Sequence, residues 1–483
     1  MLTPWVIEEM KTAKLHDKRL NDRLRDILSQ FSERPTASIP AASGGFNEMV
    51  AAYRFFDNER VTMEDILAPH IDATLLRIAA QKRVILPQDT TEVDLTRPEM
   101  EVLGAGPLDD ESRRGAFLHL SHAFTPDGTP LGTVRADMWT RQDGARKKDR
   151  KKDYKTKPIE EKESMRWVEG LSEARRLALL VPETRIVSVA DSEADIFELF
   201  DEAQASQPAI DWIVRACQDR ALINEKGEKT GASLLFEHCA QQPVLYTHEI
   251  KVRGRKAKVS CETRGRRQPR QSRTARVEVR AACITLRPPH RSDRVLAEVQ
   301  VNVVLVREID PPPGDEPVEW LLLTNLPVDS AEAARDVIQC YCTRWMIEIF
   351  FRTLKSGCRI EERRFETLPR LTNCLAVYLI VAWRTLYVCR LGRACPDMSC
   401  EAIFDPAEWK AVYRIVRGEM PPDKPPSLQV MVRMVAQLGG YVNRRRDDEP
   451  GPQTVWLGLA RAHDFALCWL TFGPDAEKHV DLM

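Results

Sequence analysis

The chain has 483 residues, 43% of them hydrophobic and 30% charged, which suits a globular protein of two or three domains. Its 71 Lys and Arg residues balance 72 Asp and Glu residues, so the net charge of −1 does not by itself indicate nucleic-acid binding. No apolar run near 18 residues and no signal-peptide pattern is evident, and we expect a cytoplasmic protein with no membrane segment. Twelve scattered cysteines without a CxxC pair predict reduced thiols and no zinc site.

Residues 1–70 are predicted to form a small helical domain. Its first long helix has a polar side dominated by basic residues, including Lys18, Arg19 and Arg23, and a Ser- and Gly-containing loop follows. A basic helix beside such a loop is suited to contact DNA phosphates. The alternative is an ordinary solvated basic face, and composition does not decide between the two.

The next part of the chain alternates strands and helices. A β-branched run ends at Asp89, and two strand-like runs are joined by the turn signal PDGTP. A further strand ends at Asp191 and is expected to lead at once into a helix containing Glu193 and Asp195. A short strand then carries Arg215. Carboxylates at strand ends lie where α/β sheets place their functional sites.

Residues 217–319 change character and read as a β-rich insertion with basic turns. Before them, residues 141–157 form a strongly basic loop whose usual meaning is a solvated segment. A strand beginning at Trp320 resumes the core sheet. From about residue 391 several helices with wide apolar faces predict a C-terminal unit that either dimerises or packs within the chain.

The segment from Asp336 to Lys355 is predicted to form one helix of about five turns, because it lacks Gly and Pro. Its polar residues Tyr341, Arg344, Glu348 and Lys355 fall within an arc of roughly 60° on such a helix. In such an arrangement the carboxylate can bind a metal ion, and the cations on either side can bind phosphate groups. A salt-bridged helix surface is the alternative.

Three carboxylates can be combined into one site if the strands that end at Asp89 and Asp191 are neighbours and Glu348 approaches them from its helix. Three oxygen ligands without His or Cys favour Mg²⁺ or Mn²⁺. Two such ions about 3.5–4 Å apart would stabilise the attacking and leaving oxygens of a phosphoryl displacement. This is the chemistry of nucleases and of DNA strand transfer.

The sequence resembles the IS-four family of bacterial DDE transposases, and within it the Tn-five-like members, from end to end. The resemblance rests on QDTT at residues 88–91, DSEADI at 191–196, WLLLTNLPV at 320–328 and a Tyr-x₂-Arg-x₃-Glu-x₆-Lys signature starting at Tyr341. AAYRFFDN near Ala51 and LQVMVRMVAQLGGYV near Leu428 resemble the family's N- and C-terminal regions.

The resemblance implies an α/β fold: an RNase H-like catalytic core (71–390, with the insertion at 217–319), an N-terminal helical DNA-binding domain (1–70) and a C-terminal helical dimerisation domain (391–483). It implies a metal-binding catalytic triad of Asp89, Asp191 and Glu348, holding two Mg²⁺ ions that Mn²⁺ can replace.

The same resemblance implies roles in DNA binding. Tyr341, Arg344 and Lys355 would hold the DNA end, and Trp320 and Arg215 would lie around a flipped base. The implied activity is cut-and-paste transposition, with nicking, hairpin formation and strand transfer. The partners are transposon inverted-repeat ends, target DNA and a second copy of the chain in a synaptic homodimer, in the bacterial cytoplasm on the nucleoid.

Two other classes of protein remain possible at this point. One is a protein that binds transposon ends without moving them, and the presence of every acidic residue argues against it. The other is a plain metal-dependent nuclease, against which the resemblance of both terminal regions argues.

Overall fold

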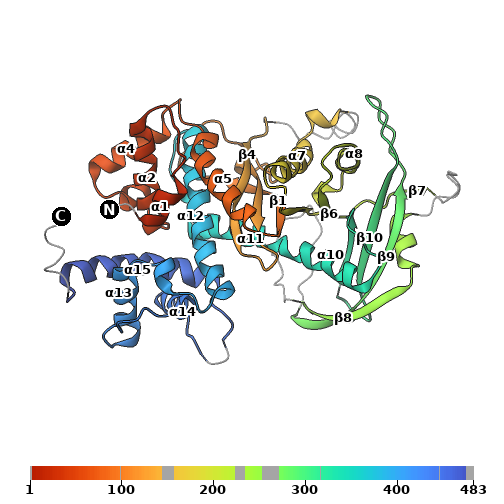
Figure 1. The fold of residues 1–483 in the computed structure, drawn as a ribbon. Helices are drawn as coiled ribbons and strands as arrows, with labels where there is room; N and C mark the ends of the chain where they lie inside the picture. The colour runs from red at the N-terminus through yellow and green to blue at the C-terminus, as the bar shows by residue number, and fades with distance from the viewer. Residues whose placement is uncertain are drawn as a thin grey trace. The chain divides into compact units, whose positions relative to one another are not determined.

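The computed structural model describes residues 3–97, 99–143, 157–223, 234–252, 271–315, 317–444 and 447–474. The chain forms two compact units (Figure 1). The first comprises Met1–Val84, Asp89–Ala145 and Trp345–Met483, and the second comprises Ile85–Gln88 and Arg146–Arg344. Most of the basic loop at 141–157, and the basic turns between residues 253 and 270, lie outside the described residues. The boundaries proposed for three sequence domains stay predictions.

The first unit opens with helices α1 (Pro4–Glu9), α2 (Lys18–Glu33), α3 (Ile39–Ala42), α4 (Phe46–Phe56) and α5 (Met63–Ala79). Local signals define where they start. The Asp17 carboxylate accepts the Arg19 N–H at the start of α2, and Thr62 and Asp65 form a capping box at the start of α5.

Helix α12 (Leu368–Ala394) is the core of the first unit. Tyr378 stacks on Phe31 of α2 with ring centroids 5.1 Å apart, and Asn373 donates a hydrogen bond to the Phe56 carbonyl of α4. The expectation that no segment is long and apolar enough to span a membrane is wrong for this helix, which contains an 18-residue window of mean hydropathy 1.5. Because 78% of that window is buried, α12 reads as a core helix.

A strand layer belongs to the same unit. Strands β3 (Arg114–Phe124) and β4 (Pro130–Trp139) form the predicted antiparallel hairpin, and β2 (Gly106–Pro107) pairs with the start of β3. The PDGTP turn needs its glycine, because Gly128 has a φ of +86°. The Trp383 indole N–H donates to the Pro130 carbonyl, which ties the hairpin to α12.

The second unit is built on a mixed sheet. Of β1 (Arg83–Asp94), only Ile85–Gln88 belongs to this unit. From β1 the strand order continues with β5 (Arg185–Ala190), β6 (Asp211–Arg215), β11 (Glu319–Thr324), β10 (Val299–Glu308), β9 (Arg273–Leu286) and β7 (Leu222–Ile223). Strand β8 (Val244–Val252) pairs with β9. Strands β5 and β6 are parallel, whereas β11 is antiparallel to both β6 and β10. The insertion strands therefore continue the core sheet, and the predicted α/β class is confirmed.

Helices accompany this sheet: η1 (Ile159–Glu161), α7 (Met165–Leu180), α8 (Phe197–Ala205), α9 (Leu235–Ala240) and α10 (Ala331–Thr343). Strands β5 and β11 are buried almost throughout, and they share one apolar cluster with α10 that includes Val187, Val189, Leu322 and Val337. The sheet and the helix that follows β11 thus share a core.

The C-terminal part of the first unit holds η5 (Cys400–Ala402), α13 (Pro406–Arg417), α14 (Leu428–Leu438) and α15 (Pro452–Phe472). Helix α14 ends at Gly439, as the Gly-Gly pair predicted. Val388 of α12 shares a buried cluster with Val432 of α14 and Val455 of α15, so the end of α12 anchors this group.

The single helix predicted from Asp336 to Lys355 is wrong in detail. Helix α10 ends at Thr343, α11 covers Trp345–Arg352, a π-helical segment η3 covers Thr353–Gly357, and the short η4 covers Ile360–Glu362. The Arg344 N–H bonds to the Tyr341 carbonyl three residues back, whereas the Cys358 N–H bonds to the Thr353 carbonyl five residues back. Each change of hydrogen-bond spacing shifts the phase of the helix, and composition does not reveal such shifts.

Candidate active site

Asp191 directly follows the buried strand β5. It begins a 3-10 turn, η2 (Ser192–Ala194), and its Oδ1 accepts the Glu193 N–H at 2.8 Å. Within the described part of the chain its other oxygen, Oδ2, accepts no hydrogen bond. A half-buried carboxylate held by one oxygen keeps the second available to a cation.

The register of the sheet brings Arg215 to the same edge. Ala190 pairs with Val214, so the residues that follow each of them, Asp191 and Arg215, are the next pair along these parallel strands. Arg215 also pairs with Leu322 of β11, and its guanidinium donates to the Glu319 carbonyl at 3.4 Å. One edge of the sheet therefore carries a carboxylate beside a guanidinium.

An aromatic pair lies near this edge, with Tyr341 at the end of α10 and Trp320 on β11. The rings of Trp320 and Tyr341 have centroids 6.1 Å apart, and the Arg344 guanidinium lies 5.9 Å from the Tyr341 ring centroid. Burial raises the pKa of the Tyr341 phenol; the Arg344 and Arg215 guanidiniums lower it and the Asp191 carboxylate raises it again. Asp191, Arg215 and Arg344 therefore all lie within electrostatic reach of the Tyr341 phenol, and Trp320 contacts its ring.

Asp195 is a structural residue of this site that sequence reasoning missed. A short 3-10 helix, η2, does follow Asp191 and contains Glu193 as expected, but Asp195 lies between η2 and α8 and not in a helix, which corrects the expectation for Asp195. Its buried carboxylate accepts the N–H groups of Cys217 and Gln218, each at 2.8 Å, and the Arg220 guanidinium at 2.6 Å. We call these four residues the Asp195 cluster. They join the turn that carries Asp191 to the segment that follows Arg215.

The first unit carries the other predicted polar residues. Asp89 is a half-buried residue of β1 whose Oδ1 accepts the Thr90 N–H at 2.8 Å. Strand β1 continues to Asp94, so the expectation that this strand ends at Asp89 is wrong. Glu348 is a half-buried residue of α11, and Lys355 lies in η3. The convergence of Asp89 and Glu348 with Asp191 stays a prediction, because Asp191 belongs to the other compact unit.

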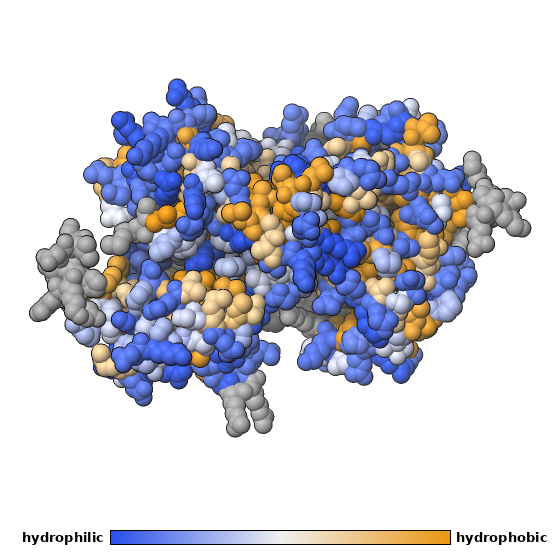
Figure 2. Space-filling model, in the orientation of Figure 1, coloured by the Kyte–Doolittle hydropathy of each residue, from blue (hydrophilic) through white to orange (hydrophobic). Residues whose placement is uncertain are grey.

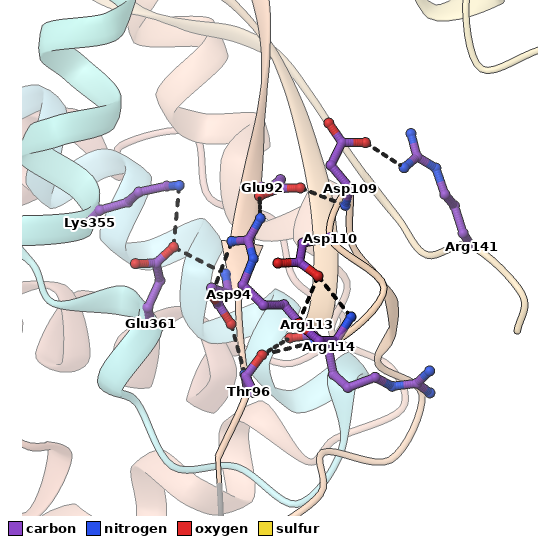
Figure 3. Close-up of polar contacts among 11 residues, drawn as sticks. Glu92, Asp94, Thr96, Asp109, Asp110, Arg113, Arg114, Arg141, Lys355 and Glu361 are labelled. Carbon is purple, nitrogen blue, oxygen red and sulfur yellow. Dashed lines mark hydrogen bonds and ion pairs between the residues drawn. The ribbon is translucent and has the colours of Figure 1, made fainter. Parts of the chain in front are cut away.

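Lys355 is held by a polar cluster at the end of β1 (Figure 3). Its ammonium lies 3.2 Å from Oε1 of Glu361, and the same oxygen accepts the Asp94 N–H at 3.1 Å. The Arg113 guanidinium bridges the carboxylates of Glu92 and Asp94. We call these five residues the β1 cluster. It fixes the direction in which the only predicted DNA-binding lysine of η3 points.

The three predicted metal ligands, Asp89, Asp191 and Glu348, all offer carboxylate oxygens. Among the described residues, no group of three or more His, Cys, Asp or Glu side chains is already arranged around a metal position. Asp191 fits such an ion, because within the described residues it offers one carboxylate oxygen that accepts no hydrogen bond. Carboxylate oxygens are the ligands that Mg²⁺ and Mn²⁺ prefer.

The predicted basic residues of the N-terminal region lie at the start of α2. Lys18 and Arg19 are exposed, whereas Arg23 is half-buried and lies 3.8 Å from the Asp26 carboxylate. On the visible face, the N-terminal helices at the upper left of Figure 2 present a largely hydrophilic surface.

The C-terminal helices expose apolar side chains. Leu467 is 45% and Phe472 84% exposed on α15, and Ile415 on α13 is 52% exposed. In the lower left of Figure 2, where α15 lies, apolar residues interrupt the hydrophilic surface. This surface suits an association between chains.

Three protein families match the chain. The family described as transposase DNA-binding matches residues 3–61, the transposase DDE domain matches residues 127–383, and the transposase Tn5 dimerisation domain matches residues 380–467. The DDE match includes Asp191 and Glu348 but begins after Asp89. Among solved structures, the chain is similar to the piggyBac transposase in a synaptic complex with hairpin DNA, at 10% identity and a TM-score of 0.38, over 81% of this chain and 72% of that one.

Proposed function

The chain belongs to the DDE transposase family, and on that premise we propose that it moves an insertion element of the bacterial IS-four type by cut-and-paste transposition. The DNA-binding and dimerisation families at its two ends make it a DNA-binding, dimerising transposition enzyme of the Tn-five-like kind. The proposed reaction is nicking at each transposon end, hairpin formation, and strand transfer into target DNA. The proposed location is the cytoplasm, on the bacterial nucleoid.

One observation carries the proposal. In the second unit, Asp191, Arg215, Trp320, Tyr341 and Arg344 gather around one sheet edge from four separate segments of the chain. A carboxylate, two guanidiniums and a half-buried indole are groups that a strand-cleaving site can use. The guanidiniums bind phosphate, the aromatic ring stacks on a base, and the carboxylate holds a metal.

Asp89, Asp191 and Glu348 would hold the metal, which we propose to be two Mg²⁺ ions with Mn²⁺ as a substitute. Bound there, divalent cations supply polarisation of the scissile phosphate and stabilisation of the attacking and leaving oxygens. The contribution of the three carboxylates is to supply hard, negatively charged oxygens from β1, from the turn after β5 and from α11.

The remaining site residues position the DNA. The Arg344 and Arg215 guanidiniums are suited to bind the phosphates on either side of the scissile one, with charge-assisted hydrogen bonds that fix its orientation. Tyr341 is a neutral phenol at physiological pH, as tyrosine ordinarily is, and burial raises its pKa further, so it can donate a hydrogen bond to a phosphate oxygen. Lys355, directed by Glu361, supplies a further positive charge from the first unit.

The partners proposed are two copies of this chain and two transposon ends in one synaptic complex. The exposed apolar residues of α13 and α15 lie in or beside the matched dimerisation region. Buried between two copies, they would supply hydrophobic contact area of the kind found in homodimers.

The test is a cleavage assay with the DNA that flanks the gene, end-labelled, with and without Mg²⁺. We expect wild-type cleavage to require the metal, and Asp89→Asn, Asp191→Asn and Glu348→Gln to abolish cleavage while end binding persists, because each removes a metal-binding charge and little contact area. Glu193→Gln is the matched control, since Glu193 is an exposed carboxylate two residues after Asp191, and should keep cleavage.

The assay also separates the two alternatives. An end-binding protein that does not transpose would bind the flanking DNA and leave it uncut in every condition. A plain nuclease would cut unrelated DNA as well as it cuts the ends. Substantial Mg²⁺-dependent cleavage by any one of the three triad variants would remove that residue from the triad.

A further inference from the structure

Helix α13 presents to solvent a polar face on which every charge is positive. Lys410, Arg414 and Arg417 are four and three positions apart, so they fall within an arc of roughly 60°. Arg414 and Arg417 are exposed, and Lys410 is half-buried. We call these three residues the α13 stripe. At 1.5 Å per residue, the stripe extends for about 10 Å along the helix.

The core of the C-terminal helices fixes which way α13 faces. Helix α13 packs on α14 and α15, at the lower left of Figure 1, through buried residues that include Trp409 and Val412. The carboxylates of Glu401, Asp405 and Glu408 lie on another side, where they line a cavity of ≈ 340 Å³ beside α1. On the helix, Glu408 lies roughly 150° from the middle of the stripe. The acidic and basic side chains of α13 are therefore separated.

The protein itself leaves the stripe unpaired. Among the described residues, no carboxylate forms an ion pair with the stripe, although Arg414 donates a hydrogen bond to the Gly418 carbonyl at 2.8 Å. In the sequence, no Asp or Glu lies three or four positions from any residue of the stripe. The neighbouring helix α14 shows the ordinary case, because its Arg433 pairs with Glu449 at 2.7 Å. Three positive charges on α13 are thus available to a ligand.

Helix stability alone does not account for this arrangement. The helix dipole favours basic residues in the last turn, where Arg414 and Arg417 lie, but Lys410 is in the middle of the helix. Like charges three and four residues apart repel each other, and exposed helices usually alternate the two signs at this spacing. The stripe is therefore disfavoured in the free chain and favoured when a polyanion neutralises it.

The chemistry of this face suits duplex DNA that is held by its backbone. Pro406 and Ala407 complete the outward side, so the face offers positive charge and no side-chain amide of the kind that reads adenine. Contacts to phosphates position a duplex and contain no sequence information. Duplex DNA has one negative charge per roughly 1.7 Å, so several phosphates fall within the length of the stripe.

Strand transfer is the step that needs such a surface. A transposon end has a fixed sequence, and the family described as transposase DNA-binding matches residues 3–61, far along the chain from α13. The target shares no required sequence with the ends, so its binding has to rest on the backbone. Helix α13 lies instead in the region that matches the dimerisation family.

We propose that the α13 stripe binds the backbone of the target DNA during strand transfer. Its three cationic side chains displace counterions from the target phosphates, which favours binding without selecting a sequence. The assignment rests on the proposed function, since strand transfer is part of it. It adds a surface for the target that is separate from the residues proposed to bind the transposon ends.

The experiment separates end cleavage, which needs no target, from the joining of pre-cut ends to an unrelated supercoiled plasmid. In the full-length chain, the triple variant Lys410→Gln, Arg414→Gln and Arg417→Gln should cleave ends as the wild type does. Its joining rate at low salt should fall roughly tenfold or more, because counterion release is lost. For binding to unrelated duplex, its slope of log K against log salt should be shallower by about 0.9 per lost contact, or about 2.7 in all.

Two further variants control for charge and for folding. Arg414→Lys combined with Arg417→Lys is the matched control, because it keeps both charges, and it should join ends as the wild type does. Lys410→Gln combined with Arg417→Gln keeps the Arg414 hydrogen bond to Gly418, so it removes charge without disturbing the end of the helix. Its salt slope should be shallower by about 1.8. Thermal unfolding and the oligomeric state of every variant are measured in parallel.

The outcomes distinguish this inference from the function it rests on. If the wild type joins ends and the triple variant joins them equally fast, the stripe does not hold the target, and the inference is overturned while the proposed function stands. Equal loss of cleavage and joining would place the stripe on the transposon ends, and loss of the two-chain complex would place it in the dimer interface; either result overturns the inference. A wild type that neither cleaves nor joins ends refutes the proposed function, and the inference fails with it.

Discussion

The Asp195 cluster holds the turn that carries Asp191, and the β1 cluster holds Lys355. The first cluster is buried, whereas the second is in contact with water. The Asp195 side chain is fully buried and that of Arg220 is 9% exposed, and two backbone N–H groups complete the carboxylate's hydrogen bonds. In the β1 cluster, the side chains of Lys355 and Glu361 are 26% and 30% exposed, and each Glu361 contact is longer than 3 Å.

This difference indicates different tasks. A buried pair with every hydrogen bond satisfied gives one rigid arrangement and is costly to break from one side. An ion pair in contact with water is worth little and exchanges partners easily. The Asp191 turn is therefore held in one geometry, whereas the Lys355 ammonium can exchange Glu361 for another anion, as the proposed phosphate contact requires.

Asp195→Ala should have the largest effect. It leaves the Arg220 guanidinium buried without its partner, which we expect to cost about 3–5 kcal/mol in the free energy of unfolding. Cleavage should fall even at temperatures where the variant is folded, because the turn that carries Asp191 loses its attachment to the segment after Arg215. Urea unfolding measures the first effect, and cleavage rates at 15 °C the second.

A double variant shows whether the effect of Asp195 is specific. Asp195→Ala combined with Arg220→Met should recover part of the lost stability, since no buried charge is then left unpaired. If stability recovers and cleavage does not, Asp195 positions the site. Normal cleavage by the single variant at full folding would show that the cluster only stabilises the fold.

Trp320→Ala tests the edge of the same site. A base stacked on an indole is worth roughly 1–3 kcal/mol, so its loss should slow hairpin formation about tenfold or more while first-strand nicking stays nearly normal. A time course of nick, hairpin and double-strand break on an end-labelled substrate measures both steps. Equal slowing of the two would mean that the ring, which lies against Tyr341, serves packing alone.

Glu408 is a third kind of carboxylate, because it is removed from water and forms no ion pair among the described residues. Burial raises its pKa to about 7 from the ordinary 4.5, so the folded protein favours the protonated form. The stabilisation from this proton is complete below about pH 4.5 and is lost as the pH rises through about 7. Glu408→Gln should therefore stabilise the protein at pH 8 by about 1–2 kcal/mol, with no gain at pH 4.5.

The amide of that variant can still accept the Asp405 N–H, which Glu408 accepts at 3.0 Å, so the helix cap should survive. Glu419→Gln, at an exposed carboxylate, is the matched control and should leave the pH dependence unchanged. Equal unfolding curves for wild type and Glu408→Gln at pH 8 would contradict the shifted pKa.

Glu361→Gln should have the smallest effect. Gln keeps an oxygen acceptor for the Asp94 N–H and removes only the charge that faces Lys355, so stability should change by less than about 1 kcal/mol. Binding to transposon ends should tighten a few-fold, because Lys355 no longer exchanges a carboxylate for a phosphate. Weaker binding would show that Glu361 must hold Lys355 in place, as Asp195 holds Arg220.

The sequence alone predicted those features that depend on neighbouring residues. The hairpin around Gly128 follows from turn chemistry, and the position of Asp191 after β5 follows from a buried apolar run that ends in a carboxylate. The end of α14 at Gly439 follows from the helix-stop signal. The fold class and the transposase resemblance rest on such local patterns in their order along the chain.

The tertiary structure alone decided the rest. Asp191 and Asp195 are four residues apart in one motif, yet only packing makes one half-exposed and pairs the other with Arg220, 25 residues away. The same holds for α12, which composition does not distinguish from a membrane span until its neighbours cover it. Burial and pairing depend on which distant segments meet, and local periodicity carries no information about those partners.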